Sequence, residues 1–416
     1  MENQIIDHLF RHQYGKMVSI LTNIFGLPHL ETIEDAVQDI FIKAMIKWRN
    51  QIPENPEAWL TAAAKNRVID LLRKIKSENN RVDRLEQHSE SQAIEELFLE
   101  DKIEDSQLRM IFTACHPILD SKDQIAFALK SIAGFSINEI ASALLLKEDT
   151  IKKRLQRARK TIKNENISFT IPDGSKLQSR LDSVFEVIYL IFNEGFHSNN
   201  QKYLIRSDLC GEAMRLNQMI LKKESLRNGA GYALFALHCF QSSRLESKQD
   251  AKGQIIDLKN QDRSRWYKPL IELGREAMYK SLSYSDYCAY HVEGAIAMEH
   301  LDTSTFDKTN WNKILALLKI LIKKTPSPLT KLNTAFVLIQ LKNFEEAKHI
   351  LDSINPNILE QRKYLFYGTK AEYFQNTGDL PRAIECLMEA ISSVTNESEK
   401  NYLQKKKNDL LKLKIY

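Results

Sequence analysis

The sequence predicts an all-α protein with more than one domain. Glycine and proline are scarce, at 13 and 10 of the 416 residues, whereas helix-forming Leu, Lys, Glu and Ala are abundant. Apolar residues recur with the helical period over most of the chain. At this length, with 43 % hydrophobic residues, two or three domains can each bury a core.

The N-terminal region predicts three amphipathic helices. Residues 5–25 fit one or two short helices, and residues 31–48 fit a stronger one. In this second helix Ile42 and Ile46 lie outside the main apolar stripe, beside acidic and amide residues. Exposed aliphatic residues in that setting indicate a docking face, although scattered surface aliphatics are common. A third helix is expected from Glu57 onward, and its C-terminal half is basic.

Charge is segregated along the chain, although the formal net charge is only +5. Residues 65–84 hold seven Lys or Arg against three acids, and residues 86–105 hold eight acids against one lysine. A second basic block follows, so the acidic run reads as part of a linker of about thirty residues, which could span roughly 100 Å at most when fully extended. Its acidity fits either an ordinary solvated linker or a mimic of nucleic acid in a basic channel of a partner.

Residues 136–163 predict a helix-turn-helix. Ser136 and Glu139 have the spacing of a capping box, and Phe135 and Ile140 can form a hydrophobic staple around it. The second helix follows a short break, and it begins at Lys147, where a Ser or Thr cap would be more usual. Its buried stripe is expected to comprise Ile151, Leu155, Ala158 and Ile162.

The outer face of this second helix is strongly basic. Eight Lys or Arg occur between Lys147 and Lys163, against Glu148 and Asp149. A polyanion such as DNA releases counterions when it binds such a surface. Positive charge concentrated on one face of the helix therefore predicts DNA binding. A solvated helix of an all-helical protein is the simpler alternative for a charge run alone.

A second boundary is expected at residues 167–176, where Pro, Asp, Gly and Ser cluster. Beyond it the chain is predicted to be helical to its end. The segments Ala335–Leu351 and Ala371–Leu387 repeat with an offset of 36 residues, close to the tetratricopeptide period. Such repeats predict a helical solenoid, which binds proteins or peptides more often than it catalyses a reaction.

The order of these blocks resembles a bacterial RNA polymerase sigma factor of the extracytoplasmic-function type, in the sigma-70 family. IEDAVQDIFIKAMIKW resembles the helix that grips the polymerase clamp, and AWLTAAAKNRVIDLLRK resembles the helix that melts and reads the promoter near the start site. The stretch from Leu108 to Ile162 resembles the C-terminal sigma domain. YLIFNEGF, QDRSRW and the terminal repeats match the subgroup with a fused tetratricopeptide-like extension, so the resemblance covers essentially the whole chain.

The resemblance implies five segments and two sets of contact residues. The segments are sigma domain 2 (1–76), an acidic linker that we expect to be flexible (77–105), the helix-turn-helix of sigma domain 4 (106–166), a short linker (167–178) and a TPR-like helical extension (179–416). The implied polymerase contacts are Asp35, Gln38, Asp39, Ile42 and Lys43. The implied DNA contacts are Asn66, Arg67, Arg73, Lys74, Lys76, Lys152, Lys153, Arg154, Gln156 and Arg157.

The expected partners are core RNA polymerase, double-stranded promoter DNA and its melted strand. We expect capture of an unstacked base near Asn66 and the loop from Gln51 to Glu57. The resemblance implies passage of the acidic linker through the RNA path of polymerase, and regulation or completion of the initiating complex by the extension. We expect no catalytic activity, cofactor or metal site.

A cytoplasmic location is expected. The N-terminus lacks the pattern of a signal peptide, and no segment has 18 consecutive apolar residues. The five cysteines are odd in number, widely spread and without a CxxC pair, which favours reduced and mostly buried thiols. They are Cys115, Cys210, Cys239, Cys288 and Cys386.

Two other classes of protein remain as alternatives. The first is a helix-turn-helix regulator that senses a ligand or protein through its repeats and never joins polymerase. Such a protein needs neither the outward Ile42 nor the acidic linker.

The second alternative is an enzyme in the C-terminal half. His291, Glu293 and His300 have the wrong spacing for a zinc site on one helix face, and Cys115 with His116 fits a packed turn better than a nucleophile and base. The Asn193–Gly195 stretch fits a helix end with Gly195 at its cap better than a binding site.

Overall fold

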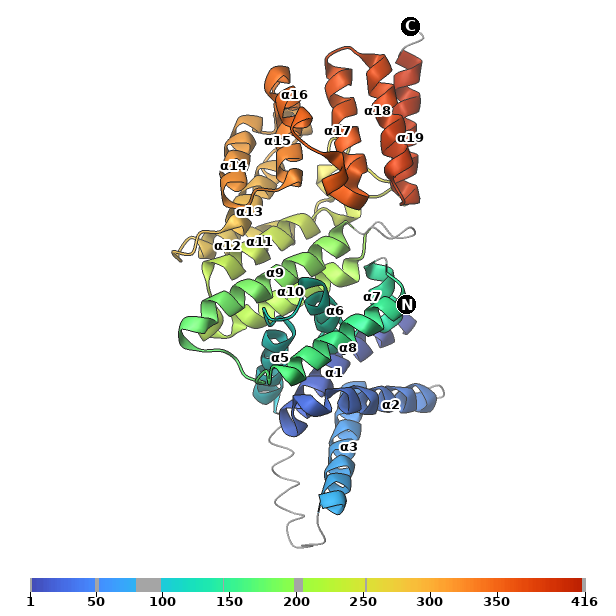
Figure 1. Ribbon diagram of the computed structural model, residues 1–416, viewed down its shortest axis with the longest axis vertical. Helices are drawn as coiled ribbons and strands as arrows, with labels where there is room; N and C mark the ends of the chain where they lie inside the picture. Colours follow the sequence, from blue (N-terminus) through green and yellow to red (C-terminus); the bar gives the residue numbers. More distant parts are fainter. Residues whose placement is uncertain are drawn as a thin grey trace. The chain divides into compact units, whose positions relative to one another are not determined.

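The protein is helical throughout the described chain. The computed structural model describes residues 2–48, 52–79, 99–144, 146–197, 205–250 and 253–413. The secondary-structure elements among these residues are helices. The β pairing within them is one isolated bridge between Gln249 and Ile255. The chain divides into two compact units, Met1–Leu190 and Ile191–Tyr416, so the all-α prediction is confirmed (Figure 1).

The first unit holds the N-terminal helices and the helix-turn-helix. Its helices are α1 (Glu2–Phe25), α2 (Leu30–Trp48), α3 (Pro56–Asn79), α5 (Glu100–Ala114), α6 (Ser121–Ser131), α7 (Ile137–Ala143), α8 (Glu148–Asn164) and the first turns of α9 (Leu177–Phe196). The 5–25 region is thus one helix, and the acidic run is helical from Glu100. Residues 80–98, most of the predicted linker, lie outside the described residues.

Helices from both sides of the acidic run pack together within this unit. α1 packs against α5 and also against α6. A Cβ atom on Gly15 of α1 would lie 1.9 Å from the carbonyl oxygen of Ile132, which follows α6, so only glycine permits α1 to lie this close to the end of α6. Glu34 of α2 is 2 % exposed and accepts a hydrogen bond of 2.7 Å from the Ser131 hydroxyl. The same carboxylate forms an ion pair with Arg159 of α8.

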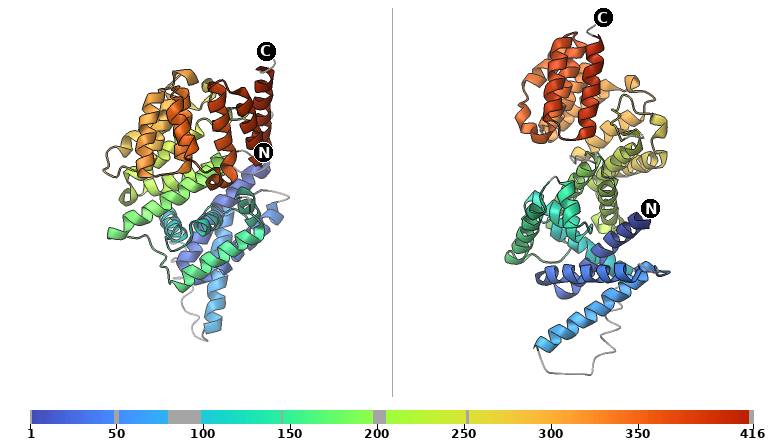
Figure 2. Two further views of the ribbon diagram at one scale, coloured as in Figure 1. Left: turned by 45° about the horizontal axis from the view of Figure 1, so that its top comes forward. Right: turned by 90° about the vertical axis from the view of Figure 1, so that its right-hand side faces the viewer.

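The second unit is a succession of helices and helix pairs. They are the end of α9, α10 (Ser207–Lys222), α11 (Gly229–Ser242), α12 (Lys268–Ser281), α13 (Ala289–Leu301), α14 (Trp311–Lys324), α15 (Pro328–Gln340), α16 (Phe344–Asp352), α17 (Lys363–Asn376), α18 (Leu380–Ser393) and α19 (Glu397–Leu413). The three last helices lie side by side in both views of Figure 2.

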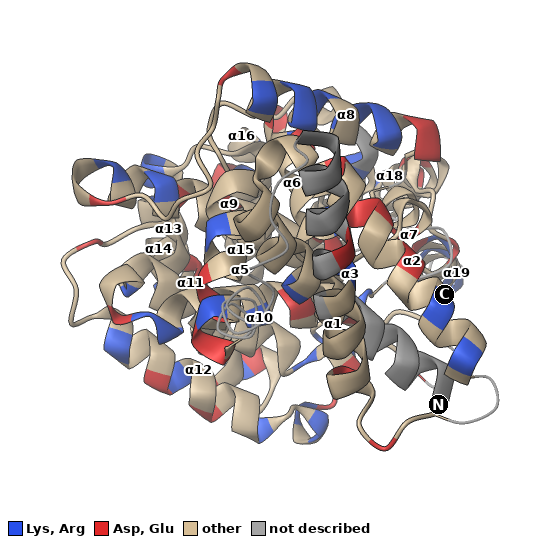
Figure 3. Cartoon of the chain, turned by 90° about the horizontal axis from the view of Figure 1, so that it is seen from below, with Lys and Arg blue, Asp and Glu red and all other residues tan. Residues whose placement is uncertain are grey.

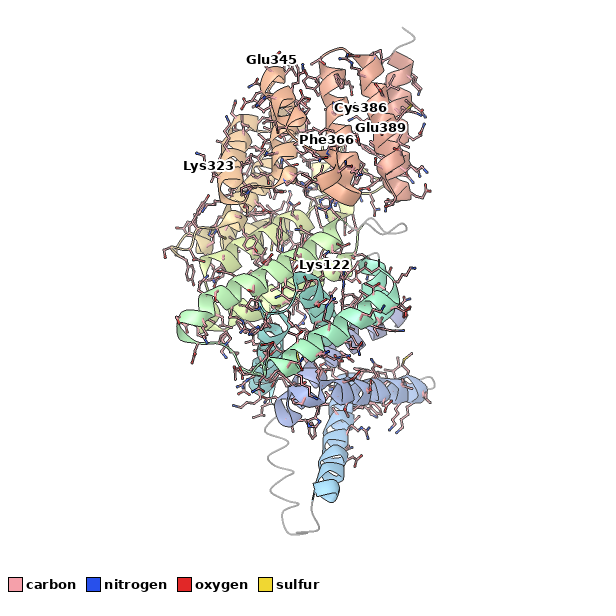
Figure 4. The ribbon with its side chains drawn as sticks, viewed as in Figure 1. Lys122, Lys323, Glu345, Phe366, Cys386 and Glu389 are labelled. Carbon is pink, nitrogen blue, oxygen red and sulfur yellow. The ribbon has the colours of Figure 1, made fainter. Side chains whose placement is uncertain are left out.

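The two predicted repeats correspond to two helix hairpins, α15 with α16 and α17 with α18. Ala335 and Ala347 are fully buried in the first hairpin, and Ala371 and Ala383 are buried at the same places in the second. Phe366 of α17 packs into the core cluster formed with α15 (Figure 4). The small residues therefore lie where the paired helices meet, and a likeness to tetratricopeptide repeats stays a prediction.

Gly195 has a different role from the helix cap that the sequence predicts. α9 continues to Phe196, and Gly195 lies inside its last turn. A Cβ atom there would lie 2.8 Å from the Arg206 carbonyl oxygen and 2.9 Å from the Cys210 backbone nitrogen. The glycine is required because the chain at 206–210 crosses the helix closely, which the sequence pattern of a helix end cannot show.

The five cysteines are free thiols. Burial raises the pKa of Cys115, Cys210 and Cys239 to about 12, and it also raises the pKa of Cys288 and Cys386. Within the described residues, no helix has both the length and the apolar character needed to cross a membrane.

Candidate nucleic-acid interface

The helix-turn-helix forms as the capping pattern predicts. The Ser136 hydroxyl accepts a 3.2 Å hydrogen bond from the Glu139 backbone nitrogen, and the Glu139 carboxylate accepts one of 2.8 Å from the Ser136 backbone nitrogen. Both bonds satisfy donors that the start of α7 would otherwise leave unpaired. α8 begins after Lys147, which makes no side-chain capping bond. Its buried residues are Ile151, Leu155, Ala158 and Ile162, the stripe that the sequence predicts.

The opposite face of α8 is open to solvent and basic. Lys and Arg recur along this face in Figure 3. Lys152, Lys153, Gln156 and Arg157 are exposed, and Arg154 is half-buried. Lys152 lies 3.6 Å from Asp149, an exposed pair that contributes little stability and leaves the lysine able to meet another anion. The structure thus brings the five predicted residues of this helix onto or near one surface.

Arg157 has a partner that sequence periodicity does not reveal. Its Nε donates to Asp123 Oδ2 at 2.5 Å and its Nη2 donates to Oδ1 at 2.6 Å. The Asp123 side chain is 3 % exposed, whereas 61 % of the Arg157 side chain remains exposed. The pair uses two of the five guanidinium N–H donors and holds α8 to α6, so the remaining donors keep a fixed direction.

The second exposed surface is the outer face of α2. Asp35, Gln38, Asp39, Ile42 and Lys43 are all exposed there. Ile42, Met45 and Ile46 have exposed fractions of 55, 58 and 60 %, so three aliphatic side chains lie together along the same helix. Met45 is an addition to the two aliphatics that the sequence singles out. An apolar patch of this kind, rimmed by charge, is typical of a protein docking face.

A groove of about 510 Å³ lies between α2 and α3. It is lined from α2 by Ile40, Lys43, Ile46 and Lys47, and from α3 by Trp59, Ala62, Ala63, Asn66, Arg67 and Asp70. The groove therefore joins Lys43 of the predicted polymerase set to Asn66 and Arg67 of the predicted DNA set. Its lining residues come from the two helices. Residues 52–57, the described part of the Gln51–Glu57 segment where base capture is also expected, are not among them, and Pro56 and Glu57 already belong to α3.

The groove combines an aromatic ring with positive charge. Trp59 packs edge to face on Trp48 with ring centroids 5.5 Å apart, and the Lys47 ammonium lies 5.7 Å from the Trp59 ring. The buried Nε of Arg67 has no hydrogen-bond partner among the described residues. A groove with these features can stack a base and pair with a phosphate. Arg73, Lys74 and Lys76 also belong to α3, but their side chains lie outside the described residues.

Cys115, His116 and His291 are the residues that the enzyme alternative would use. Burial holds the pKa of Cys115 at about 12 and lowers that of His116 to about 4, so the thiol is not activated at neutral pH. His291 instead contacts its own helix start, because its Nδ1 accepts a 3.2 Å hydrogen bond from the Cys288 backbone nitrogen. Within the described chain no group of three or more His, Cys, Asp or Glu side chains could hold a metal ion.

Comparison with protein families matches three regions of the chain. Residues 2–78 match sigma-70 region 2, residues 109–162 match sigma-70, region 4, and residues 180–282 match a family of unknown function (DUF6596). The first two matches contain the α2–α3 groove and α8. The third covers the start of the C-terminal extension.

Two curated proteins are similar to this chain. An uncharacterised protein of Rhizobium meliloti is 29 % identical over 388 residues, which cover 90 % of this chain and 89 % of the relative. A protein described as ECF RNA polymerase sigma factor SigE, from Mycolicibacterium smegmatis, is 25 % identical over 158 residues, 38 % of this chain and 60 % of the relative. No solved structure matches the chain. The chain therefore belongs to the extracytoplasmic-function group of sigma-70 family RNA polymerase sigma factors and carries a C-terminal extension.

Proposed function

We propose that α2 docks on core RNA polymerase, that α3 binds the melted promoter strand and that α8 reads the distal promoter element. The observation that carries the proposal is the aliphatic row of Ile42, Met45 and Ile46 on α2, next to a groove that contains Asn66 and Arg67. Apolar exposure favours a protein partner on one side of the groove, while positive charge favours nucleic acid on the other. Core polymerase and chromosomal DNA share the cytoplasm of a bacterium, so we place the action of the chain there.

Reconstitution with core polymerase tests this assignment. The full chain should form a stable complex with core enzyme and produce a promoter-specific transcript. The double variant Ile42→Asp/Ile46→Asp should weaken that complex about tenfold or more, since two charges enter an apolar contact. Ile358→Asp is a matched control, because Ile358 is 63 % exposed in the extension. Failure of the unaltered chain to bind core enzyme would favour a regulator that acts without polymerase.

α3 can be tested separately from docking. Asn66→Ala and Arg67→Gln should impair promoter opening, measured by permanganate reactivity of unpaired thymines, while core binding persists. Asn66 is exposed on the groove wall, so its replacement removes a polar contact without opening a cavity in the core. Normal promoter opening by both variants would contradict the placement of the melted strand in the groove.

We propose further that the extension regulates or completes the initiating complex, through contact with a protein or peptide. The size and organisation of the extension support this proposal, because Ile191–Tyr416 forms a compact unit with its own core clusters. A chain that ends at Leu190 contains the whole first unit, including the hydrogen bond from Arg180 to the Phe112 carbonyl, and its helix content by circular dichroism checks that it folds. Identical transcription and identical stress response by the full and shortened chains would eliminate this role.

A further inference from the structure

One buried lysine and two half-buried arginines lie close together in the extension, and both arginines contact one tryptophan. Arg244 and Lys248 follow α11, and Arg263 begins a short 3₁₀ helix, Arg263–Arg265. The guanidinium carbons of Arg244 and Arg263 lie 5.9 and 4.8 Å from the Trp266 ring centroid. Trp266 is itself fixed, since its Nε1 donates to the Ser247 hydroxyl at 2.9 Å. We call Arg244, Lys248 and Arg263 the cationic cluster.

Their hydrogen bonds end on uncharged oxygens. Lys248 is 8 % exposed; its Nζ donates to the Phe196 carbonyl at 2.6 Å and lies 3.5 Å from the Phe196 ring centroid. Nη1 of Arg263 donates to the carbonyls of His300 and Thr303 at 2.5 and 2.7 Å, and to the Thr303 hydroxyl at 2.6 Å. Nε of Arg244 and Nη2 of Arg263 are buried and have no partner among the described residues.

Among the described residues, no carboxylate lies within ion-pair distance of the cluster. Burial lowers the pKa of Lys248 to about 7 and that of Arg244 to about 10, and adjacent positive charge adds to both shifts. Glu399 is the acid whose charge reaches Lys248, but no ion pair joins the two within the described chain, and the Tyr364 hydroxyl donates to Glu399 at 2.5 Å. Burial also lowers the pKa of His197 and His300, so both imidazoles are neutral at physiological pH.

The cluster lies where two unexplained sequence motifs meet. Arg263 and Trp266 belong to QDRSRW, and Phe196, whose carbonyl accepts the bond from Lys248, ends YLIFNEGF. Both motifs fall within residues 180–282, which match the family of unknown function. The roles proposed above for α2, α3 and α8 use none of these residues, so their arrangement requires an explanation of its own.

Uncompensated buried cations are unfavourable unless an anion accompanies them. Guanidinium groups donate in a planar fork that matches the oxygens of phosphate, and a lysine adds a point charge. Arg244 and Arg263 are half-buried, so part of each side chain is exposed at the surface. We propose that the cationic cluster binds a small phosphate-bearing anion, which supplies negative charge and acceptors that the described residues do not. A dianion with several oxygens meets more of these donors than a single carboxylate does.

Calorimetric titration of the full chain tests the site. The probes are inorganic phosphate, pyrophosphate and adenosine monophosphate, with malonate as a carboxylate dianion, all at constant ionic strength and pH 8. We expect saturable binding of at least one phosphate probe at one site. Saturation by phosphate or pyrophosphate alone identifies an inorganic anion, whereas tighter binding of the nucleotide identifies a phosphorylated metabolite. Equal affinity for malonate, or no saturable binding of any phosphate probe, would overturn the proposal.

Variants locate the binding and separate it from folding. Arg244→Gln should lower the affinity at least tenfold, whereas Arg382→Gln should not change it, because Arg382 is an exposed arginine of α18. Without ligand, Arg244→Gln should keep or raise the thermal midpoint, since it removes an unbalanced charge. A lower midpoint together with unchanged affinity would show that Arg244 serves only to pack on Trp266.

Proton uptake gives an independent readout. An anion next to Lys248 favours its charged form, so binding at pH 8 should take up close to one proton, measured in buffers of different ionisation enthalpy. The groups that act on Lys248 are Arg244, Cys210 and Glu399. Lys248→Met should abolish the uptake and weaken binding. Uptake that persists in Lys248→Met would refute the role of this lysine.

Discussion

Two buried acids of the first unit, which we call the sigma-factor unit, have different kinds of partner from the cationic cluster of the extension. Glu34 and Asp123 of the sigma-factor unit are both 2 % exposed, and each faces a guanidinium, that of Arg159 and of Arg157 respectively. The cationic cluster of the extension faces carbonyl oxygens and has no such carboxylate among the described residues. These two acids of the sigma-factor unit therefore have charged partners, whereas the cations of the cluster have uncharged ones. The exposed positive charge of the sigma-factor unit lies along α8.

The largest effect is expected at the internal pair of the sigma-factor unit. Glu34→Ala leaves Arg159 without its buried partner and the Ser131 hydroxyl without its acceptor, which should cost about 3 kcal/mol. Glu31→Ala is the control, because the Glu31 side chain is 76 % exposed although it lies 3.6 Å from the same arginine. It should cost about 0.5 kcal/mol or less. Hydrogen exchange of the α2 and α8 amides measures the loss of stability in both variants. An equal loss in the two would contradict a special role for the buried Glu34–Arg159 pair.

Charge reversal on α8 tests whether its outward charge serves DNA. Lys152→Glu/Lys153→Glu should weaken promoter binding by the holoenzyme about a hundredfold and reduce the slope of log affinity against log salt by about two. Fluorescence anisotropy at several salt concentrations measures both quantities. Lys280→Glu/Lys323→Glu is the control, since these lysines are exposed in the extension. Loss of core binding by the α8 variant would contradict the division of labour between α2 and α8.

The interior charge of the extension should produce a pH dependence. The pKa of Lys248 is about 7 in the folded chain, below the value of about 10.4 for a free lysine. Between these values the unfolded chain binds the extra proton, so stability rises with pH by up to about 1.4 kcal/mol per pH unit. Lys248→Met has no such increase in stability with pH. The stability difference between this variant and the unaltered chain should therefore shrink from pH 7 to pH 9. Thermal midpoints that change in parallel would show that Lys248 is not responsible.

The smallest effect concerns the uncapped start of α8. Lys147→Ser supplies a capping hydroxyl and removes a positive charge from the positive end of the helix dipole, which should stabilise the first unit by about 1 kcal/mol. Lys160→Ser removes the same charge from the helix interior, where no free backbone donor exists, and should not stabilise. Urea unfolding of the chain that ends at Leu190 compares the two, and an equal gain for both would point to charge alone.

Local patterns in the sequence predict much of the sigma-factor unit. The capping box of Ser136 and the buried stripe from Ile151 to Ile162 are confirmed because both depend on residues within a few turns of each other. The exposure of Ile42 follows from the same periodicity. The roles in polymerase and DNA contact come from resemblance to a family, and they stay predictions at the level of single residues.

Contacts between distant residues could not be predicted in this way. Glu34 and Arg159 are 125 positions apart, and each alone looks like an ordinary surface charge. The same holds for Arg244, Lys248 and Arg263, which lie outside the long helices, where periodicity gives no burial signal. QDRSRW identifies a subgroup, but its neighbours in space become visible only when the chain is folded.

The protected thiols have a practical consequence for measuring these contacts. Since burial raises the pKa of all five cysteines, few of them are thiolates at neutral pH, and maleimide reagents react with thiolates. A single cysteine introduced at an exposed position, such as Gln156→Cys on α8, should therefore react far faster than the natural ones. The natural sequence is in effect already prepared for site-specific fluorescent labelling, without removal of its own cysteines.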